Sequence, residues 1–246
     1  MASLRASRVL VSLPDRLVVV TAAESGVSLE QVFRRLVVSR RGEAVQETAA
    51  ALARVGRWTR AFQDGVPVRN PAARRDQREY LDVRLRRLVA ALNGRFTEAH
   101  RRALLERFEA YASRVDGDDR RAVAVHADLC PANILVRPDA VTVLDFGMSA
   151  DDVRFTDLAH LDSHLQRLGR RWRLPPRIVE TLERALLTAY DPSFDTSHPL
   201  FRLLLLQHLV CQMTECAEAA AGPWPFLHAR LVQHRVSTAM SLAVAL

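Results

Sequence analysis

The sequence predicts an α+β fold in which helices form most of the molecule and short strands occur at the start and in the middle of the chain. Helices are indicated by apolar residues that recur every three or four positions, as in Leu81-Leu85-Leu88-Leu92. Strands are indicated by short valine-rich runs, such as 8–13 and 17–21, which Pro14-Asp15 separates as a turn. Together the two patterns favour a helical body with a small amount of sheet.

The individual elements can be placed in order along the chain. The two amino-terminal runs form a hairpin, and the helix after it begins at Ser28, which forms a capping box with Gln31. The β pattern returns in the middle of the chain at 122–125, 134–137 and 141–145. Apolar stripes predict further helices at 52–62, 81–92, 104–111, 158–168, 178–186 and 200–220, and a last one from Pro225.

The composition is that of an ordinary globular protein. Of 246 residues, 49% are hydrophobic and 26% charged, so disordered and low-complexity classes are excluded. No segment reaches the roughly 18 apolar residues of a membrane span, and we expect no membrane association. Cys130, Cys211 and Cys216 form neither an even-numbered disulfide framework nor a metal-type cluster, which favours a reducing cytoplasm.

The basic residues have one unusual feature, because all 35 of them are Arg and the chain contains no Lys. A function that needs a lysine amine is therefore excluded for this chain. The net charge is +7, but the Arg residues occur as scattered pairs without interleaved aromatic residues. We interpret them as solvated helix faces and expect no nucleic acid as a partner. An Arg-rich nucleic-acid binder remains a rival hypothesis, which requires a steep salt dependence of binding.

The middle β region contains the chemistry. A loop after the first strand places Asp128 and Asn133 five residues apart, and Asp145-Phe146-Gly147 follows the next two strands. A three-residue hairpin loop at 138–140 would place Asn133 opposite Asp145, where both side-chain oxygens could reach one Mg²⁺. Gly147 would then allow an unusual backbone turn after the strand. The alternative is a hairpin that happens to have polar ends.

These residues resemble the catalytic core of the protein-kinase-like superfamily, in particular the aminoglycoside phosphotransferase and choline kinase-like families. The pattern there is H-x-D-x-x-x-x-N followed by a strand pair and D-F-G. The resemblance implies that Asp128 is the catalytic base, or orients the acceptor hydroxyl, and that Asn133 and Asp145 bind Mg²⁺. It implies that His126, Gly147 and Asp157 are structural members of the loop region. The short stretch after Gly147 and the lack of an A-P-E motif favour small-molecule kinases over protein kinases.

Two further segments are similar to these families. Residues 17–26 resemble the hinge between kinase lobes, where the backbone of Ala22, Ala23 and Glu24 would bind adenine. The segment that begins Thr156-Asp157 resembles the Asp-Leu-Ala segment of small-molecule kinases. On its own residue type, Asp157 is either a helix N-terminal carboxylate or a substrate contact. Asp151 and Asp152 are predicted to form a solvated turn.

The resemblance implies a protein-kinase-like fold that consists mostly of the helical C-terminal lobe, with a catalytic β-hairpin and a truncated N-terminal lobe. Residues 1–26 would be a remnant of the small lobe and hinge, and 27–246 the C-terminal lobe. The Gly-rich loop and the phosphate-binding Lys of a full small lobe do not precede the hinge-like segment. Either the sequence is a truncated reading or the chain is a large-lobe remnant.

The predicted function is transfer of the ATP γ-phosphate to a hydroxyl of a small molecule, with ATP and Mg²⁺ as cofactors. The alternative is a non-catalytic, pseudokinase-like module that binds a nucleotide or a partner. Residues 145–246 carry 10 Arg against 11 acidic residues, which argues mildly against a polycationic aminoglycoside as the acceptor. Sugars and amino alcohols stay open as acceptor classes.

Overall fold

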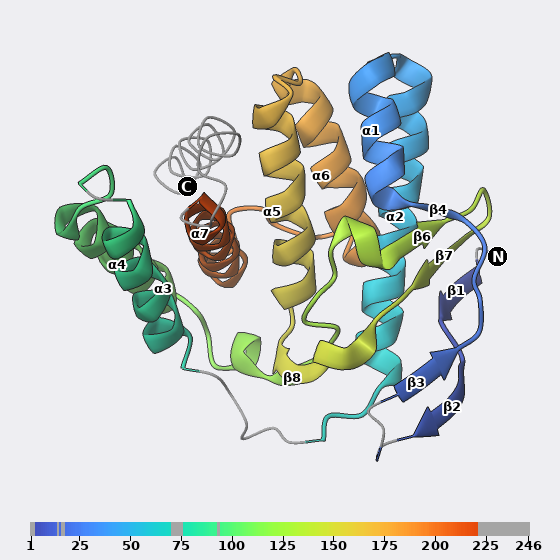
Figure 1. The fold of residues 1–246 in the computed structure, drawn as a ribbon, viewed down its shortest axis with the longest axis horizontal. Coiled ribbons are helices and arrows are strands. Elements are labelled where there is room, and N and C mark those ends of the chain that lie inside the picture. The colour runs from blue at the N-terminus through green and yellow to red at the C-terminus, as the bar shows by residue number, and fades with distance from the viewer. Residues whose placement is uncertain (1–2, 14, 16–17, 70–75, 93, 221–246) are drawn as a thin grey trace.

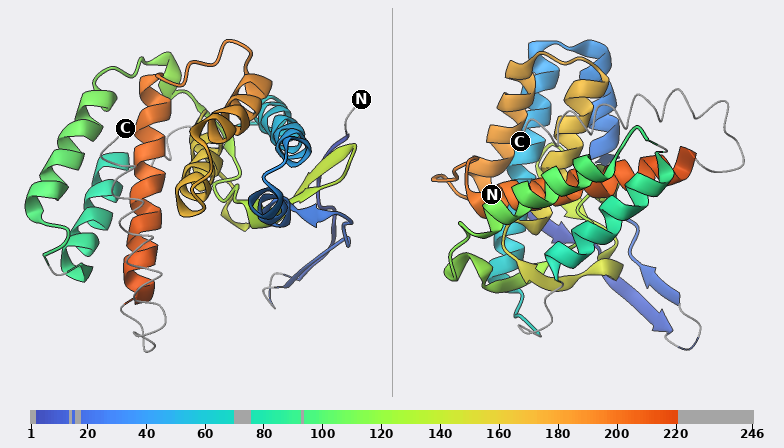
Figure 2. Two further views of the ribbon diagram at one scale, coloured as in Figure 1. Left: turned by 90° about the horizontal axis from the view of Figure 1, so that it is seen from above. Right: turned by 90° about the vertical axis from the view of Figure 1, so that its left-hand side faces the viewer.

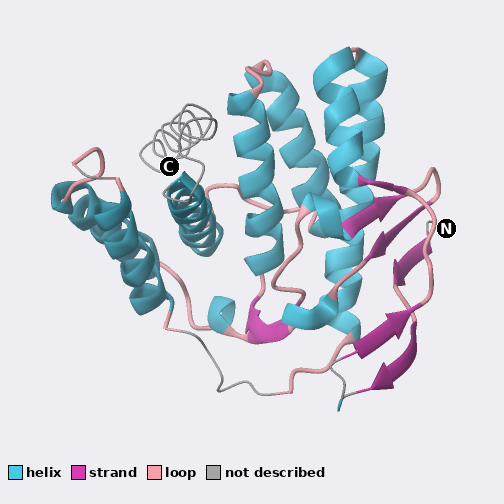
Figure 3. Ribbon diagram, viewed as in Figure 1, coloured by secondary structure: helices cyan, strands magenta, loops and turns pink. Residues whose placement is uncertain are grey.

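The computed structural model describes the chain except for residues 1–2, 14, 16–17, 70–75, 93 and 221–246. Long helices form most of the described part, and short strands lie along one side (Figures 1 and 3). In chain order the elements are β1 (Ser3–Ala6), β2 (Val9–Leu13), β3 (Val18–Thr21), β4 (Val27–Ser28), α1 (Leu29–Ser39), α2 (Gly42–Gly65), α3 (Gln77–Ala91), α4 (Glu98–Ala112), η2 (Asp118–Arg120), β5 (Ala122–Val125), η3 (Pro131–Asn133), β6 (Ile134–Val136), β7 (Ala140–Val143), η4 (Phe146–Met148), β8 (Ala150–Val153), α5 (Thr156–Arg171), α6 (Pro176–Tyr190) and α7 (Pro199–Ala220).

The helices form two groups that share the core. Helices α1, α2, α5 and α6 stand side by side, and α3 and α4 pack on α7, which also contacts α5 (Figures 1 and 2). The predicted stripes are the buried faces, as in α3, where Leu81, Leu85 and Leu88 are fully buried. The most extensive helix pair is α2 with α6. It packs closely at Gly56, where a Cβ would lie 2.2 Å from the carbonyl oxygen of Leu186.

The strands form three small sheets. The largest has the order β1-β7-β6-β4, in which β1 is parallel to β7 and the other pairs are antiparallel. Strands β2 and β3 form the predicted amino-terminal hairpin, and β5 pairs with β8. The capping box between Ser28 and Gln31 at the start of α1 is also confirmed.

Three strands were not predicted from the sequence, namely β1, β8 and the two-residue β4, which lies where only the start of a helix was predicted. Strand β1 was missed because Ser3–Ala6 contains no β-branched or aromatic residue and only one large apolar residue, Leu4. It is held by backbone pairing with β7 and by the Trp58 Nε1–H, which donates to the carbonyl of Arg5. The prediction of a solvated turn at Asp151 and Asp152 was wrong, because both residues belong to β8 and pair with β5. Pairing in the folded chain overrode their low β propensity.

The last predicted helix, from Pro225, lies outside the described residues. Within the part of the chain that the structure describes, no helix is both long and apolar enough to cross a membrane.

Candidate functional site

The candidate site is the loop between β5 and β6, which contains His126, Asp128 and Asn133. Strand β5 is paired with β8, and β6 is paired with β7, so a separate strand pair holds each end of the loop. The loop is therefore placed by backbone pairing at both ends. The two strand pairs thus fix the positions of His126, Asp128 and Asn133.

His126 is fully buried and connects the loop to the segment that precedes Asp145. Its Nδ1 accepts the backbone N–H of Asp128 at 3.3 Å, so the ring proton is on Nε2, which lies 2.8 Å from the carbonyl oxygen of Leu144. Both ring nitrogens are used within the protein. This bonding suits a structural histidine better than a proton-transfer group.

Asp157, in the first turn of α5, binds the backbone of the same loop. Its two carboxylate oxygens accept the backbone N–H groups of His126 at 2.8 Å and Ala127 at 2.9 Å. The side chain is fully buried, and burial raises its pKa to about 6 although the two backbone hydrogen bonds lower it. The residue type alone left Asp157 as either a helix N-terminal carboxylate or a substrate contact, and the family resemblance implied a structural loop residue. In the structure its carboxylate anchors the loop.

Asp128 and Asn133 are in direct contact. The Asn133 side-chain amide donates to the carboxylate Oδ2 of Asp128 at 2.9 Å and to its backbone oxygen at 3.0 Å. These bonds turn Asn133 Oδ1 away from Asp128 and leave it without a hydrogen-bond partner in the described part of the chain. Both residues are half-buried rather than fully enclosed.

The hairpin register differs by one residue from the predicted one. Arg137 N–H donates to Ala140 O, and Val136 pairs with Val141, so the turn contains two residues rather than three. Asn133 consequently lies opposite Leu144, whose N–H donates to the Asn133 carbonyl at 2.9 Å. The expectation that Asn133 faces Asp145 directly was therefore wrong. A turn shortened by one residue moves every pair along the strand.

Asp145 begins the segment after this strand and is solvent-exposed. Its backbone is left-handed, with φ 59°, and its Oδ1 accepts the N–H of Gly147 at 3.3 Å. The unusual turn predicted at Gly147 is thus made by Asp145 instead. Gly147 is nevertheless confined, because a Cβ there would lie 3.2 Å from the Asp145 carboxylate.

Phe146, between them, turns towards the core. Its ring lies 4.8 Å from that of His126, 5.7 Å from Phe62 and 6.1 Å from Trp58, measured between centroids. The aromatic cluster therefore joins the D-F-G segment to the β5–β6 loop and to α2.

The predicted hinge directly follows β3. The N–H of Ala22 donates to Arg8 O at 2.8 Å, and its carbonyl accepts from Ser7 Oγ at 3.2 Å. Ala22 is thus part of the hairpin, which its position in the sequence alone did not indicate. Its amide is already hydrogen-bonded and therefore cannot bind adenine as predicted. The backbone amides of Ala23 and Glu24 have no hydrogen-bond partner among the described residues.

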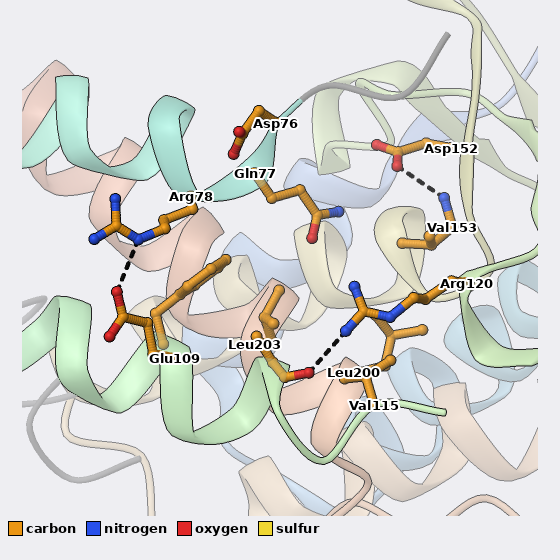
Figure 4. A pocket seen from close by; sticks show the side chains of 12 residues that line it. Asp76, Gln77, Arg78, Glu109, Val115, Arg120, Asp152, Val153, Leu200 and Leu203 are labelled. Carbon is orange, nitrogen blue, oxygen red and sulfur yellow. Dashed lines mark hydrogen bonds and ion pairs between the residues drawn. The ribbon is translucent and has the colours of Figure 1, made fainter. Parts of the chain in front are cut away.

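A cavity of about 300 Å³ lies away from the β5–β6 loop, between α3, α4, β8 and α7 (Figure 4). Its floor is apolar, and its rim carries three carboxylates and two guanidinium groups, one of which pairs with a carboxylate at 2.7 Å. None of the predicted site residues lines it. The residues that line it are Asp76, Gln77, Arg78, Phe108, Glu109, Ala112, Val115, Arg120, Asp152, Val153, Leu200 and Leu203.

In the described part of the chain, no three His, Cys, Asp or Glu side chains lie close enough together to hold a metal ion. A metal here would therefore depend on the amide oxygen of Asn133, a carboxylate and ligands that the protein does not supply. Mg²⁺ is commonly bound in this way, with one or two carboxylates, waters and substrate phosphates. The free oxygens of Asn133 and Asp145 fit this donor set.

The helical body, the β5–β6 loop held between two strand pairs and the D-F-G segment define a protein-kinase-like fold. The sequence model of the phosphotransferase enzyme family matches residues 15–196. The chain belongs to this family. No curated protein sequence matches it.

Solved structures of small-molecule kinases have the same fold. A glucosamine kinase superposes with a TM-score of 0.63 at 19% identity, over 93% of this chain and 61% of that one. Plasmodium vivax ethanolamine kinase gives 0.59 at 11% identity, over 96% and 67%. The ADP-bound aminoglycoside phosphotransferase APH(2'')-Ib gives 0.55 at 14% identity, over 97% and 75%. The chain spans only 61% of the glucosamine kinase, and the match covers nearly all of its own length.

Proposed function

We propose that this protein is a phosphotransferase that moves the γ-phosphate of ATP to a hydroxyl of a small molecule. The observation that carries the proposal is the contact between Asp128 and Asn133 in a loop that Asp157 anchors. Family membership supports the reaction class. Within this proposal, residues 1–26 are part of a small lobe with its hinge, and 27–246 are the C-terminal lobe.

In this mechanism Asp128 accepts or orients the proton of the attacking hydroxyl. Its Oδ2 is held by Asn133, which leaves Oδ1 for the acceptor. Catalysis by these enzymes depends mainly on positioning and charge stabilisation, so the rigid hold on Asp128 matters as much as its basicity. His126 and Asp157 then act as positioning residues, because each holds the loop backbone.

Mg²⁺ would be held by Asn133 and Asp145 and would neutralise charge on the phosphates. Asp145 Oδ1 accepts from Gly147, and Oδ2 has no hydrogen-bond partner among the described residues. The nucleotide base would contact the backbone of Ala23 and Glu24, whose amides are available. A glucosamine kinase with the same fold is known in complex with glucosamine, ADP and inorganic phosphate, which supports ATP as the donor here.

The acceptor is a hydroxyl-bearing small molecule that lies against the helices after Asp157. The structural neighbours act on glucosamine, ethanolamine and aminoglycosides. The near-neutral balance of residues 145–246 favours sugars and amino alcohols over a polycation. A cytoplasmic location is part of the proposal, since the three cysteines are free thiols and ATP is available there.

The first test is calorimetric titration of Mg·ATP into the wild type, Asp145→Ala and Asp139→Ala. Asp139 is an exposed carboxylate in the β6–β7 turn, so its variant controls for a general change in charge. We expect binding by the wild type and by Asp139→Ala and a loss of at least about tenfold in Asp145→Ala. Equal binding by all three variants would contradict the proposed metal site.

The second test measures ADP release with glucosamine, choline and ethanolamine as acceptors, beside Asp128→Asn. General-base catalysis contributes about 10²–10⁴-fold, so the variant should lose turnover by that factor while it still binds Mg·ATP. Turnover equal to wild type in Asp128→Asn would refute the assigned role.

A pseudokinase-like binding module is the second candidate, and the lack of Lys favours it. Arg presents a planar fork rather than a compact point charge, so it replaces a phosphate-binding Lys poorly. This candidate predicts metal-dependent nucleotide binding with no turnover for any acceptor. The two tests above therefore separate the candidates.

A further inference from the structure

Three histidines from two helices form a cluster that the proposed mechanism does not use. His160 and His164 belong to α5, and His208 belongs to α7, which packs on α5. The rings of His160 and His208 are stacked, with centroids 4.7 Å and planes 9° apart, and the ring of His164 lies 5.2 Å from that of His160. All three residues are half-buried. Stacked rings do not direct their nitrogen atoms to a common point, so the cluster is not an arrangement of metal ligands.

The cluster lies beside the loop that contains Asp128. Residues three or four apart share a face of a helix, so Asp157, His160 and His164 form one row along α5. Asp157 begins this row and binds the loop backbone. For the next residue of the row, His160, burial lowers the pKa to about 4, although the nearby carboxylate of Asp128 acts in the opposite direction. The imidazole of His160 therefore borders the proposed base on the side of α5.

The rings of His160 and His164 are uncharged near neutral pH. Arg167 Nη2 lies 3.0 Å from His164 Nδ1, and because a guanidinium has only donors, Nδ1 accepts and the ring is neutral. The lowered pKa of His160 keeps its ring neutral as well. Among the described residues, the ionisable groups that act on His160 are Asp128, His126 and Arg167. One carboxylate is thus balanced by one guanidinium, and an ammonium group would find no net attraction here.

His160 also has unused capacity for hydrogen bonds. Its Nδ1 is buried and has no hydrogen-bond partner among the described residues, whereas its Nε2, which has no partner there either, is not buried. A buried nitrogen without a partner costs stability, and an apolar residue of similar size would avoid this cost. The accessible Nε2 can form a hydrogen bond with a hydroxyl group, and the apolar body of an imidazole can pack against carbon.

We propose that His160, His164 and His208 bind the acceptor and select an uncharged, hydroxyl-rich molecule, such as a neutral sugar or polyol, over one that carries an ammonium group. His160 Nε2 contacts an acceptor hydroxyl, and the stacked ring of His208 holds His160 in place. A hydroxyl exchanges its bonds to water for bonds to imidazole, whereas an ammonium ion would lose hydration without gaining an opposite charge. The inference rests on the proposed function, because it narrows the acceptor from sugars and amino alcohols to the uncharged class.

Binding is tested without turnover by NMR of the full chain with isotope-labelled histidine, with Mg·ADP added so that no phosphate is transferred. The spectrum of His160→Gln assigns the His160 signal. The uncharged probes are D-glucose and myo-inositol, and the cationic probe is choline. We expect at least one uncharged probe to shift the His160 signal saturably, with a dissociation constant at least about tenfold below that of choline. Equal or tighter binding of choline, or no shift with either uncharged probe, overturns the proposal.

Three variants separate a direct contact from a structural role. His160→Leu keeps the bulk of the side chain without its hydrogen bond, so the uncharged probe should bind about five- to tenfold more weakly while Mg·ATP binds as before. His160→Gln keeps a donor and an acceptor and should retain binding within about threefold. His100→Gln is the control, because His100 is exposed on α4 and Gln preserves the capping box with Thr97, and it should match the wild type. Wild-type binding by His160→Leu, or an equal loss in His160→Gln, refutes the contact.

The inference and the proposed function fail in different ways. Binding of an uncharged probe at His160 without ADP release for any acceptor would support the selectivity of the cluster and contradict phosphoryl transfer. ADP release with choline or ethanolamine, but with no uncharged acceptor, would support phosphoryl transfer and overturn the selectivity.

Discussion

The carboxylate of Asp157 accepts the N–H of Ala127 at 2.9 Å, and Ala127 has a left-handed backbone with φ 64°. Few residues other than Gly adopt this conformation without a compensating contact. The same carboxylate accepts the N–H of His126, two residues before Asp128. One buried side chain of α5 therefore sets the path of the loop that carries the proposed catalytic base.

Asp157→Asn should destabilise the protein without a change in overall fold. The amide keeps one acceptor oxygen, so one buried loop N–H loses its partner, at a cost of about 1–3 kcal/mol. Urea unfolding followed by circular dichroism measures this difference. Asp139→Asn, at an exposed carboxylate, is the control and should match the wild type. Equal stability of both variants would mean that Asp157 does not support the loop.

The free energy of unfolding should depend on pH in the way that the titration of Asp157 predicts. Burial raises its pKa from 3.8 to about 6, so the folded chain binds a proton more readily than the unfolded chain. The stability that this group contributes is thus fully present below pH 3.8 and is lost as the pH rises through about 6. The free energy of unfolding of the wild type minus that of Asp157→Asn should fall across this window. A difference that is flat or rises with pH contradicts the raised pKa.

Asn133 is predicted to have two separable functions, as a donor to Asp128 and as a metal ligand. Asn133→Ala removes both and should weaken Mg·ATP binding at least about tenfold. Asn133→Asp restores an oxygen ligand but not the donors, and it places a second carboxylate beside Asp128. We expect this variant to keep metal-dependent binding with a lower melting temperature. Calorimetry and thermal unfolding report the two effects, and wild-type nucleotide binding by Asn133→Ala would exclude the metal role.

Gly56 should be essential for the packing of α2 on α6. A Cβ at this position would lie 2.2 Å from Leu186 O, so the helices must move apart. Overpacking of this kind costs about 1–3 kcal/mol, and contact with backbone places Gly56→Ala at the upper end. Gly65→Ala is the control, because a Cβ there meets nothing within 4 Å. Denaturant unfolding should show a large loss for the first variant and none for the second.

Sequence patterns predicted the helices well because each buried stripe is a local property of its own segment. The stripe of Leu81, Leu85 and Leu88 and the capping box at Ser28 both appear where their spacing indicated. The register of the β6–β7 hairpin was missed by one residue, since a two-residue and a three-residue turn are both compatible with Pro138-Asp139-Ala140. Strand β8 was missed because Asp151 and Asp152 have low β propensity and depend on β5 for pairing.

The family of this protein could be recognised from its sequence, because the residue types and spacing of Asp128, Asn133 and Asp145 are local features of the chain that indicate oxygen-ligand chemistry. How those groups are held became visible only in the folded structure. The two oxygens of Asp157 meet loop amides about 30 residues away, and the amide of Asn133 turns towards Asp128. Such contacts depend on strand register and helix packing, which are properties of the whole fold and leave no local signal in the sequence.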